Sequence, residues 1–589
     1  MSRLLPSSPR RWLVPLCTAL LLTACGGGDS ASSGSSDPDS RLSISASMLP
    51  GDDEDAHRFL TQATFGATPS EVARVRKIGY DNWIDEQLAL PLQSSHLSMA
   101  EASARHRGHT TVDAYDVVNT WWTHAVHDPA QLRQRLAFAL SEIFVVSTVS
   151  VGNGRTVASY LDMLTEGSNQ TYRQLLESVA LHPAMGQYLS HLTNRKEDPT
   201  SGRVPDENFG REVMQLFSIG LYQLDSQGQQ VKVGNKPVET YNADDVKGMA
   251  KVFTGWSWFS PQAILATGIE TWRCFWRVNP CKEDSQDVTA MSPYASEHST
   301  SARTVLGTAI AAQSAPNPKA DLSDALDRLA QHPNTAPFIS RQLIQRLVTS
   351  NPSPQYVGDV AAVFRSSGGN FKAVVKAILL HAEARHPETV LTDLSTYGKL
   401  REPVIRLAHL LRTLPHTSKA YTDSQAAGTL PFLMTTDTDS SSSALGQSPM
   451  RSPSVFNFFR PGYSPPQTRM GNAKLVAPEM QITNETSVVA YANFVSAILR
   501  DGWGQWRSES NQLDIQFDTS AFNTQVSSGS SLIDAVAQAL LGAPLPADTR
   551  ALATTALDAM PASTDGQKKQ RIRAAILLTA VSPGFTVQQ

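Results

Sequence analysis

The chain has few cysteines, little net charge and, beyond residue 25, no long apolar run. It contains four cysteines in 589 residues, and 50 lysines and arginines oppose 54 acidic residues, which leaves a formal net charge of -4. A mildly acidic chain carries no basic footprint for nucleic acid, so nucleic-acid binding is not expected. Because no later stretch of about 18 apolar residues follows the N-terminus, the sequence predicts no transmembrane helix.

The sequence also lacks the motifs of several familiar enzyme classes. It has no HExxH pair for a zinc hydrolase, no GxSxG nucleophile elbow, no Walker loop, no dinucleotide-binding GxGxxG and no CxxCH for covalent haem. Each absence lowers the expectation of one enzyme class without excluding an unfamiliar one.

Residues 1–24 have the pattern of an export signal. Three arginines, at positions 3, 10 and 11, precede an apolar core over residues 12–22 that is too short to span a bilayer permanently. The core leads into Leu22-Thr23-Ala24-Cys25, which resembles the bacterial lipobox, where the cysteine thiol is diacylated and the chain is cut before it. We therefore expect a lipoprotein signal peptide over residues 1–24 and lipidation of Cys25. A signal peptide cut at an ordinary small residue is the alternative.

The same region predicts where the protein resides. Gly26 stands where an inner-membrane retention signal would have Asp, which favours the outer membrane, with the protein facing the periplasm. Residues 25–52 are rich in Gly, Ser and Asp and have little to bury. We expect them to form a flexible linker that holds the following domain about 25–30 Å from its lipid anchor.

Two of the four cysteines remain in the body of the chain, in the stretch TWRCFWRVNPC. In an oxidising compartment, Cys274 and Cys281 are close enough in sequence to predict a disulfide, with two free buried thiols as the alternative. A zinc site is disfavoured because the pair lacks a second close pair of ligands.

From residue 53 onward, helical periodicity dominates. The run QLRQRLAFALSEIFVVS has a broad apolar face and predicts a buried helix, and Thr68-Pro69-Ser70-Glu71 has the pattern of a helix start. Strand signals are sparse, with a hairpin at 231–241 as the best candidate, and 416–448 reads as a long loop. The sequence predicts an all-α, multi-helix domain over 53–589 with few or no short strands, and a division into two subdomains near 310–320 is left open.

The chain resembles a known bacterial family over nearly the whole of 53–589. The segments that carry the resemblance are RFLTQATFGATPSEV, RQRLAFALSEIFVVS, LHPAMGQYLSHLTNRKEDP, PDENFGREVMQLFSIGLYQLD, VFTGWSW, KLREPVIRLAHLL, SPMRSPSVFNFFRPGY and SPGFTVQ. In these segments the chain is similar to the family called domain of unknown function 1800 (DUF1800). The resemblance implies an exported or envelope protein, often encoded beside a sulfatase-like exported protein that becomes a candidate partner. It implies no reaction.

One polar helix face is the leading candidate for chemistry. The segment PDENFGREVMQLFSIG (205–220) predicts one helix, with Pro205 and Asp206 at its start and Gly220 at its end. Helical spacing gathers four polar residues on one face: Asn208, Arg211, Glu212 and Gln215. Such a face can bind an anion, ligate a metal or hold a general base. The alternative is a structural role, in which Glu207 pairs with Arg211 along the helix.

Further candidates lie in loops. His298 matches a histidine of the family and could act as a metal ligand or an acid–base group. Binding candidates besides Glu207 are Asn194, Arg195, Lys196, Trp256 and Arg451. The three residues at 194–196 precede the polar helix and would suit a phosphate or sulfate group.

These patterns lead to two functional hypotheses. The first is a membrane-anchored envelope lipoprotein that acts as a binding, scaffold or maturation partner of another exported protein, because the sequence shows no recognisable catalytic set. The alternative is an envelope hydrolase or oxidoreductase, metal-assisted in one version, with Glu212, Arg211, Asn208 and His298 as catalytic residues. The sequence specifies no particular cofactor or metal.

Overall fold

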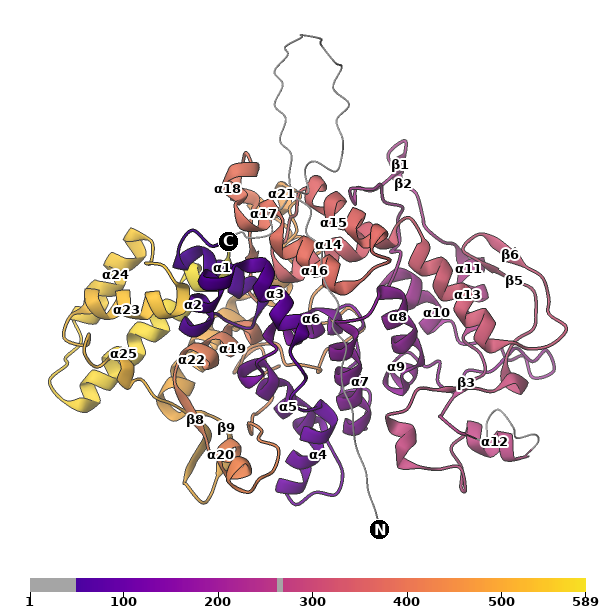
Figure 1. Cartoon of the computed structure of the whole chain (residues 1–589), viewed down its shortest axis with the longest axis horizontal. Coiled ribbons are helices and arrows are strands. Elements are labelled where there is room, and N and C mark those ends of the chain that lie inside the picture. The colour runs from indigo at the N-terminus through magenta and orange to yellow at the C-terminus, as the bar shows by residue number, and fades with distance from the viewer. Residues whose placement is uncertain (1–48, 262–268) are drawn as a thin grey trace, which may run out of the picture. The chain divides into compact units, whose positions relative to one another are not determined.

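A computed structural model describes residues 49–261 and 269–589 (Figure 1). The expected signal peptide, the expected lipidation site at Cys25 and most of the expected linker lie outside the described residues. The described residues belong to one compact unit with a hydrophobic core of its own. A unit with its own core can fold by itself. The division expected near 310–320 stays a prediction.

The predicted all-α class is confirmed. Helices make up 53% of the described residues, and the strands among them form only small sheets of two or three strands. In the part of the chain that the structure describes, no helix combines the length and the apolar character that a membrane crossing requires.

The first third of the domain is helical. Its helices are α1 (Asp53–Ala63), α2 (Pro69–Ile78), α3 (Tyr80–Ala89), α4 (His96–His106), α5 (Ala114–His127), α6 (Gln131–Ser141) and α7 (Gly154–Gly167). The predicted helix start at Thr68 is confirmed, because its side chain accepts a hydrogen bond from the Glu71 amide and Pro69 occupies the first turn. Every residue of α6 is buried, including Arg133 and Arg135.

The middle third mixes helices with short hairpins. Its elements are α8 (Tyr172–Leu181), α9 (Pro183–Tyr188), α10 (Asn208–Gln215), β1 (Lys232–Val233), β2 (Lys236–Pro237), α11 (Ala243–Val252), β3 (Trp256–Ser257), α12 (Ile269–Phe275), β4 (Ser292–Pro293), β5 (Arg303–Val305), β6 (Thr308–Ile310), α13 (Pro318–Gln331), α14 (Thr335–Leu347), α15 (Pro354–Ser366) and α16 (Phe371–Leu380). The antiparallel pair of β1 and β2 confirms the hairpin predicted at 231–241.

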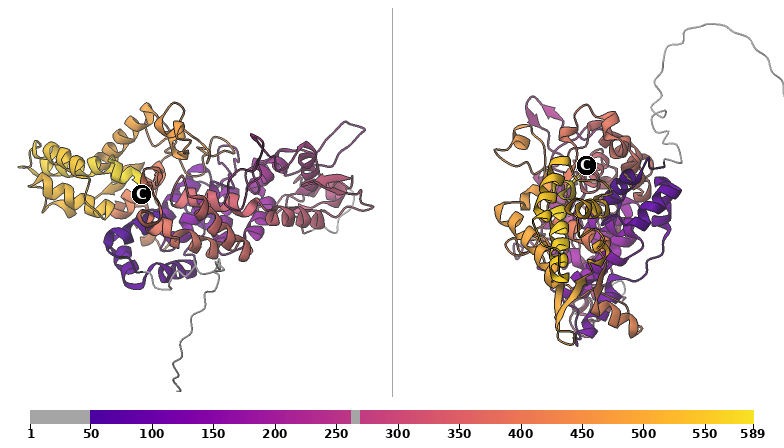
Figure 2. Two further views of the ribbon diagram at one scale, coloured as in Figure 1. Left: turned by 90° about the horizontal axis from the view of Figure 1, so that it is seen from above. Right: turned by 90° about the vertical axis from the view of Figure 1, so that its left-hand side faces the viewer.

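The last third of the domain ends in contact with the first third. Its elements are α17 (Ala382–Arg385), α18 (Pro387–Val390), β7 (Lys399–Leu400), α19 (Pro403–Thr413), β8 (His416–Ser418), α20 (Lys419–Ala426), α21 (Arg469–Asn472), α22 (Glu485–Asp501), β9 (Trp503–Arg507), β10 (Gln512–Phe517), α23 (Gly529–Leu541), α24 (Ala547–Asp558), α25 (Asp565–Ala580), α26 (Pro583–Thr586) and β11 (Val587–Gln588). β11 pairs antiparallel with β7 and also contacts α1, so the C-terminus lies beside the first helix (Figures 1 and 2).

The prediction of a loop over 416–448 is wrong for the first third of that range. β8 and α20 occupy residues 416–426, because β8 pairs with β10 and the Ser418 side chain caps α20 through the Tyr421 amide. The pairing partner comes from residues 512–517, far along the chain, so no local pattern at 416 reveals the strand.

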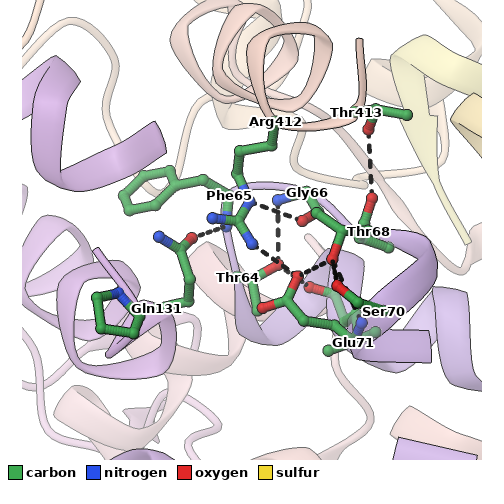
Figure 3. Close-up of polar contacts among 12 residues, drawn as sticks. Thr64, Phe65, Gly66, Thr68, Ser70, Glu71, Gln131, Arg412 and Thr413 are labelled. Atoms are coloured by element: carbon green, nitrogen blue, oxygen red, sulfur yellow. Dashed lines mark hydrogen bonds and ion pairs between the residues drawn. The ribbon is translucent and has the colours of Figure 1, made fainter. Parts of the chain in front are cut away.

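Arg412 of α19 ties the loop between α1 and α2 to the core (Figure 3). Its Nε donates to the Gly66 carbonyl at 2.9 Å, and its Nη2 lies 2.7 Å from Oε2 of Glu71. The Thr68 hydroxyl donates to the same Glu71 oxygen at 2.8 Å. The arginine side chain is only 6% exposed, so this ion pair is largely shielded from water.

Arg412→Ala is expected to lower the free energy of unfolding by about 3 kcal/mol, because Glu71 and two backbone carbonyls lose their donor in a buried setting. Urea unfolding followed by circular dichroism measures the change. Arg74→Ala is the matched control, since Arg74 forms a half-exposed pair with Glu86 that contributes at most about 1 kcal/mol. Equal midpoints for the two variants would contradict the role given to Arg412.

Candidate functional site

The predicted polar helix is shorter than expected. α10 runs from Asn208 to Gln215 and does not reach 205 or 220. Asp206 is held in the preceding loop, because its amide donates to Oδ1 of Asn194 at 2.8 Å and its own carboxylate accepts from the Asn208 amide. Beyond Gln215, the amide of Gly220 bonds the Met214 carbonyl, and Gly220 takes a φ of 72° that ends the helix.

The residues of the polar face differ in their surroundings. Arg211 pairs with Glu207 at 3.1 Å, and both side chains are nearly half exposed. Glu212 is 8% exposed, and its Oε2 has no hydrogen-bond partner among the described residues. Burial raises the pKa of Glu212, and the charge of Arg211 offsets this only in part. Asn208 makes one long contact, 3.4 Å, with the Ser190 hydroxyl.

His298 lies in a different polar group. It is fully buried, with Nδ1 2.7 Å from the Thr254 carbonyl and Nε2 2.8 Å from Oδ2 of Asp321. Arg303 contacts the same Asp321 oxygen at 2.6 Å. Burial alone would raise the pKa of Asp321, but hydrogen bonds from His298 and Gln313 and the charge of Arg303 lower it. Both ring nitrogens of His298 are thus engaged within the fold.

The loop at 194–196 is bonded to Gly255, just before Trp256, and to the segment before His298. The Gly255 amide donates to the Asn194 carbonyl at 2.8 Å, and the Lys196 amide donates to the Glu297 carbonyl at 2.8 Å. Arg195 forms an ion pair with Glu297, with its Nε 2.6 Å from Oε2, and not with Glu212. Lys196 is exposed, whereas Trp256 is buried.

Arg451 belongs to a third group, since it pairs with Asp437 at 3.4 Å and with Asp439 at 2.9 Å. The structure therefore distributes the candidate residues over separate groups. None of them lines either of the two cavities described below. Within 49–261 and 269–589, no group of three or more His, Cys, Asp or Glu side chains is arranged to hold a metal ion. Cys274 and Cys281 are joined by a disulfide.

Two buried carboxyl groups, which the sequence analysis did not select, meet in the core. Glu142 caps the C-terminal end of α6, and Glu402 precedes α19. Asn457 donates to Oε1 of Glu142 at 2.9 Å, and Gln447 donates to Oε2 of Glu402 at 2.7 Å. The other oxygen of each carboxyl group accepts no hydrogen bond from the described residues. The sequence feature that could have pointed to this pair is Glu142 itself, a charged residue at the end of a helix whose other residues are buried.

Burial, followed by the neighbouring Glu402, raises the pKa of Glu142 well above its ordinary value. Two carboxyl groups in contact cannot both ionise at low cost, so we interpret Glu142 as keeping its proton above the ordinary pKa of a glutamate. Beside the pair, Arg346 lies 3.7 Å from Glu142, and Lys399 lies 2.9 Å from the equally buried Glu479.

A cavity of about 20 Å³ adjoins Glu142 and is lined in part by Gln447, Ser448, Ser452 and Asn457. The hydroxyl groups of Ser448 and Ser452 have no partner within the described residues. This volume suits about one water molecule and not an organic substrate. The carboxyl pair can therefore hold a proton, but it does not form a substrate site.

A much larger cavity, about 680 Å³, opens between α1, the segment before α19 and the C-terminal elements. His57, Tyr397 and Arg401 line it, and each of these side chains is at most 8% exposed. Arg401 donates to the Phe585 carbonyl at 3.0 Å, and its Nη2 lies 2.8 Å from Nδ1 of His409. The volume falls within the range of small-molecule sites, about 300–1,000 Å³.

Burial sets the charge of this wall. It lowers the pKa of His57 to about 3, with a further contribution from the Arg401 charge, so the imidazole is neutral. It raises the pKa of Tyr397 to about 12, so the phenol keeps its proton. It lowers the pKa of Arg401 to about 9, which leaves the guanidinium charged at neutral pH. The wall thus carries one buried cation beside neutral hydrogen-bonding groups.

Glu142→Gln is expected to remove a pH dependence of stability. Because the folded pKa of Glu142 is raised, the folded chain keeps a proton that the unfolded chain loses above about pH 4.5. The free energy of unfolding of the wild type therefore falls as pH rises toward the folded pKa, by up to about 1.4 kcal/mol per pH unit. Glutamine cannot lose this proton, so the variant gains stability relative to the wild type as pH rises from about 5 to about 9.

Thermal unfolding across this pH range measures the difference. Glu177→Gln, which replaces a half-exposed carboxylate on α8, serves as the control and should keep the wild-type profile. A Glu142→Gln profile parallel to that of the wild type would refute the proton on Glu142.

Residues 58–587 match the family model described as "Protein of unknown function (DUF1800)". No curated protein and no solved structure matches the chain. The matched range includes the polar face of α10, the carboxyl pair and the wall formed by Tyr397 and Arg401. Because the family model covers nearly all of the described residues, the chain belongs to the DUF1800 family.

Proposed function

We propose that this protein is a membrane-anchored envelope lipoprotein that binds a small organic ligand in the cavity lined by His57, Tyr397 and Arg401. The cavity itself carries the proposal, because its volume of about 680 Å³ suits such a ligand. Its lining combines a few buried polar groups with leucine and proline side chains. This combination is typical of sites that bury an apolar body and orient it through a few polar contacts.

The cavity wall is packed firmly enough to be present before a ligand binds. A Cβ atom on Gly542 would lie 2.7 Å from that of His57, so α1 and the end of α23 are in close contact. β7 and β11 pair through the backbone beside Arg401, and the Arg401 backbone amide bonds the Thr586 carbonyl. A preformed site binds without the cost of ordering its walls.

The charges of the wall favour binding over acid–base catalysis. A general acid or base works best when its pKa lies near the ambient pH. The pKa of His57 is about 3 and that of Tyr397 about 12, so neither buried group exchanges protons readily near neutrality. The expected role as a binding, scaffold or maturation partner of another exported protein, including a sulfatase-like one, stays a prediction beside this small-ligand proposal.

Replacing Ala543 by Trp is expected to fill part of the cavity and expel its ligand, because Ala543 lines the cavity. The test is mass spectrometry of small molecules that remain with the protein after purification from the envelope. Wild type and the control Ala551→Trp, which alters an exposed position on α24, should retain the same molecule. Retention by Ala543→Trp, or no molecule on the wild type, would reject the binding site.

Cys25→Ala is expected to abolish lipid attachment, because the thiol that receives the lipid is removed. Metabolic labelling with a fatty acid, together with fractionation of the envelope, measures the loss. Cys17→Ala, in the same segment, should keep the label. Label that persists in Cys25→Ala would disprove the anchor.

A further inference from the structure

Arg401 is a buried cation without a counter-ion. Its side chain is 4% exposed, and no carboxylate of the described residues lies within ion-pair distance of it. Its contacts are the Phe585 carbonyl, a neutral His409 and the Phe585 ring, whose centroid lies 4.9 Å away. Its Nε has no hydrogen-bond partner among the described residues. Buried charges in proteins are ordinarily paired, so a guanidinium that lines a cavity in this state lacks a partner.

The groups behind Arg401 add to the positive potential. Arg406 and Arg135 lie close enough for their charges to lower the pKa of Arg401. Arg406 has no carboxylate partner in the described chain either and stacks over Tyr491 at 4.1 Å. An anion placed at Arg401 would reduce this repulsion.

The other charged groups around the cavity lie nearer to solvent. The carboxylate of the last residue, Gln589, also borders the cavity, but Gln589 is exposed and forms no ion pair with Arg401. Glu54 is exposed, and Glu388, half exposed, lies 3.4 Å from His386. Arg58 is already paired with Asp55 at 2.6 Å. The uncompensated charge is therefore on the buried side of the cavity, at Arg401.

The remainder of the lining is largely apolar. Leu394, Leu540, Leu541, Pro544 and Pro583 contribute to it, and they come from three separate segments of the chain. A ligand that reaches Arg401 with an acidic group must lay the rest of its body along these side chains. Burying an apolar chain there is favourable by about 0.8 kcal/mol per methylene.

We infer that the ligand is an amphipathic organic anion, whose carboxylate, sulfate or phosphate group pairs with Arg401 and whose apolar body lies along the leucine and proline side chains. The planar guanidinium presents paired donors that match such oxyanions. This inference rests on the proposed function and names the chemical class of its ligand.

Isothermal titration calorimetry on residues 46–589 tests the inference with octanoate, octyl sulfate, hexanoate, acetate and the neutral octanamide. We expect octanoate or octyl sulfate to bind, and the stronger of the two identifies the head group. Each added methylene between hexanoate and octanoate should tighten binding about fourfold. Octanamide should bind at least about tenfold more weakly than octanoate, since it lacks the charge.

Arg401→Gln should weaken octanoate about tenfold to a hundredfold and leave octanamide unchanged. Arg74→Gln is the control for the loss of one arginine charge, because Arg74 pairs with Glu86 and does not line the cavity, and it should keep wild-type affinity. Wild-type affinity for octanoate in Arg401→Gln would overturn the assignment to Arg401. The wild-type comparison of octanoate with octanamide decides the question of charge even if Arg401→Gln does not fold.

Equal binding of octanoate and octanamide would overturn the anionic class but keep the proposed small-molecule site. Equal binding of acetate and octanoate would overturn the inference that the ligand has an apolar body. If none of the probes binds while the protein from the envelope retains a neutral or cationic molecule, only this inference fails. If none binds and nothing is retained, both this inference and the proposed function fail.

Discussion

One cluster of charges in the core of this protein is tolerable because its members lie beside one another. Glu142, Glu402 and Glu479 are almost completely buried, and so are Arg135, Arg346 and Lys399. Arg135 donates to the Arg346 carbonyl, and Lys399 donates both to that carbonyl and to Glu479. These residues come from α6, α14, β7, the start of α19 and the turn at 478–482. Removing β7 or the turn at 478–482 would leave Glu479 or Lys399 buried without its partner, at a cost of several kcal/mol, so the cluster fixes how these elements pack.

The short segment 399–402 connects this cluster to the cavity. Lys399 and Glu402 lie in the cluster, while Arg401, between them in sequence, lines the cavity. β7 holds the segment in place by pairing with β11, and the Phe585 carbonyl and ring contact Arg401. The cavity wall therefore depends on the docking of the C-terminal residues against the middle of the chain.

The candidate residues chosen from the sequence were surface-like polar residues at helical spacing or in loops. In the structure, several of them pair with another side chain: Arg211 with Glu207, Arg195 with Glu297, and His298 with Asp321. Glu212 alone among them keeps a buried, unpartnered carboxylate oxygen. The strongest sites in the structure instead use charged residues inside apolar helices and at helix ends. Such residues are not selected from the sequence, because a charged residue among apolar ones only weakens the apolar periodicity that predicts a buried helix.

The sequence by itself determined what depends on neighbours along the chain. Helical spacing gave the buried helix α6, the Thr68-Pro69 pair gave the start of α2, and hairpin residues gave β1 and β2. Only the tertiary structure decided that Glu142 meets Glu402 and that the cavity is closed by residues 54–61, 387–401, 540–546 and 583–589. Caps and periodicity are set by interactions within one or two helical turns, whereas the energy of a buried charge depends on partners brought in from distant segments, and no local pattern encodes them.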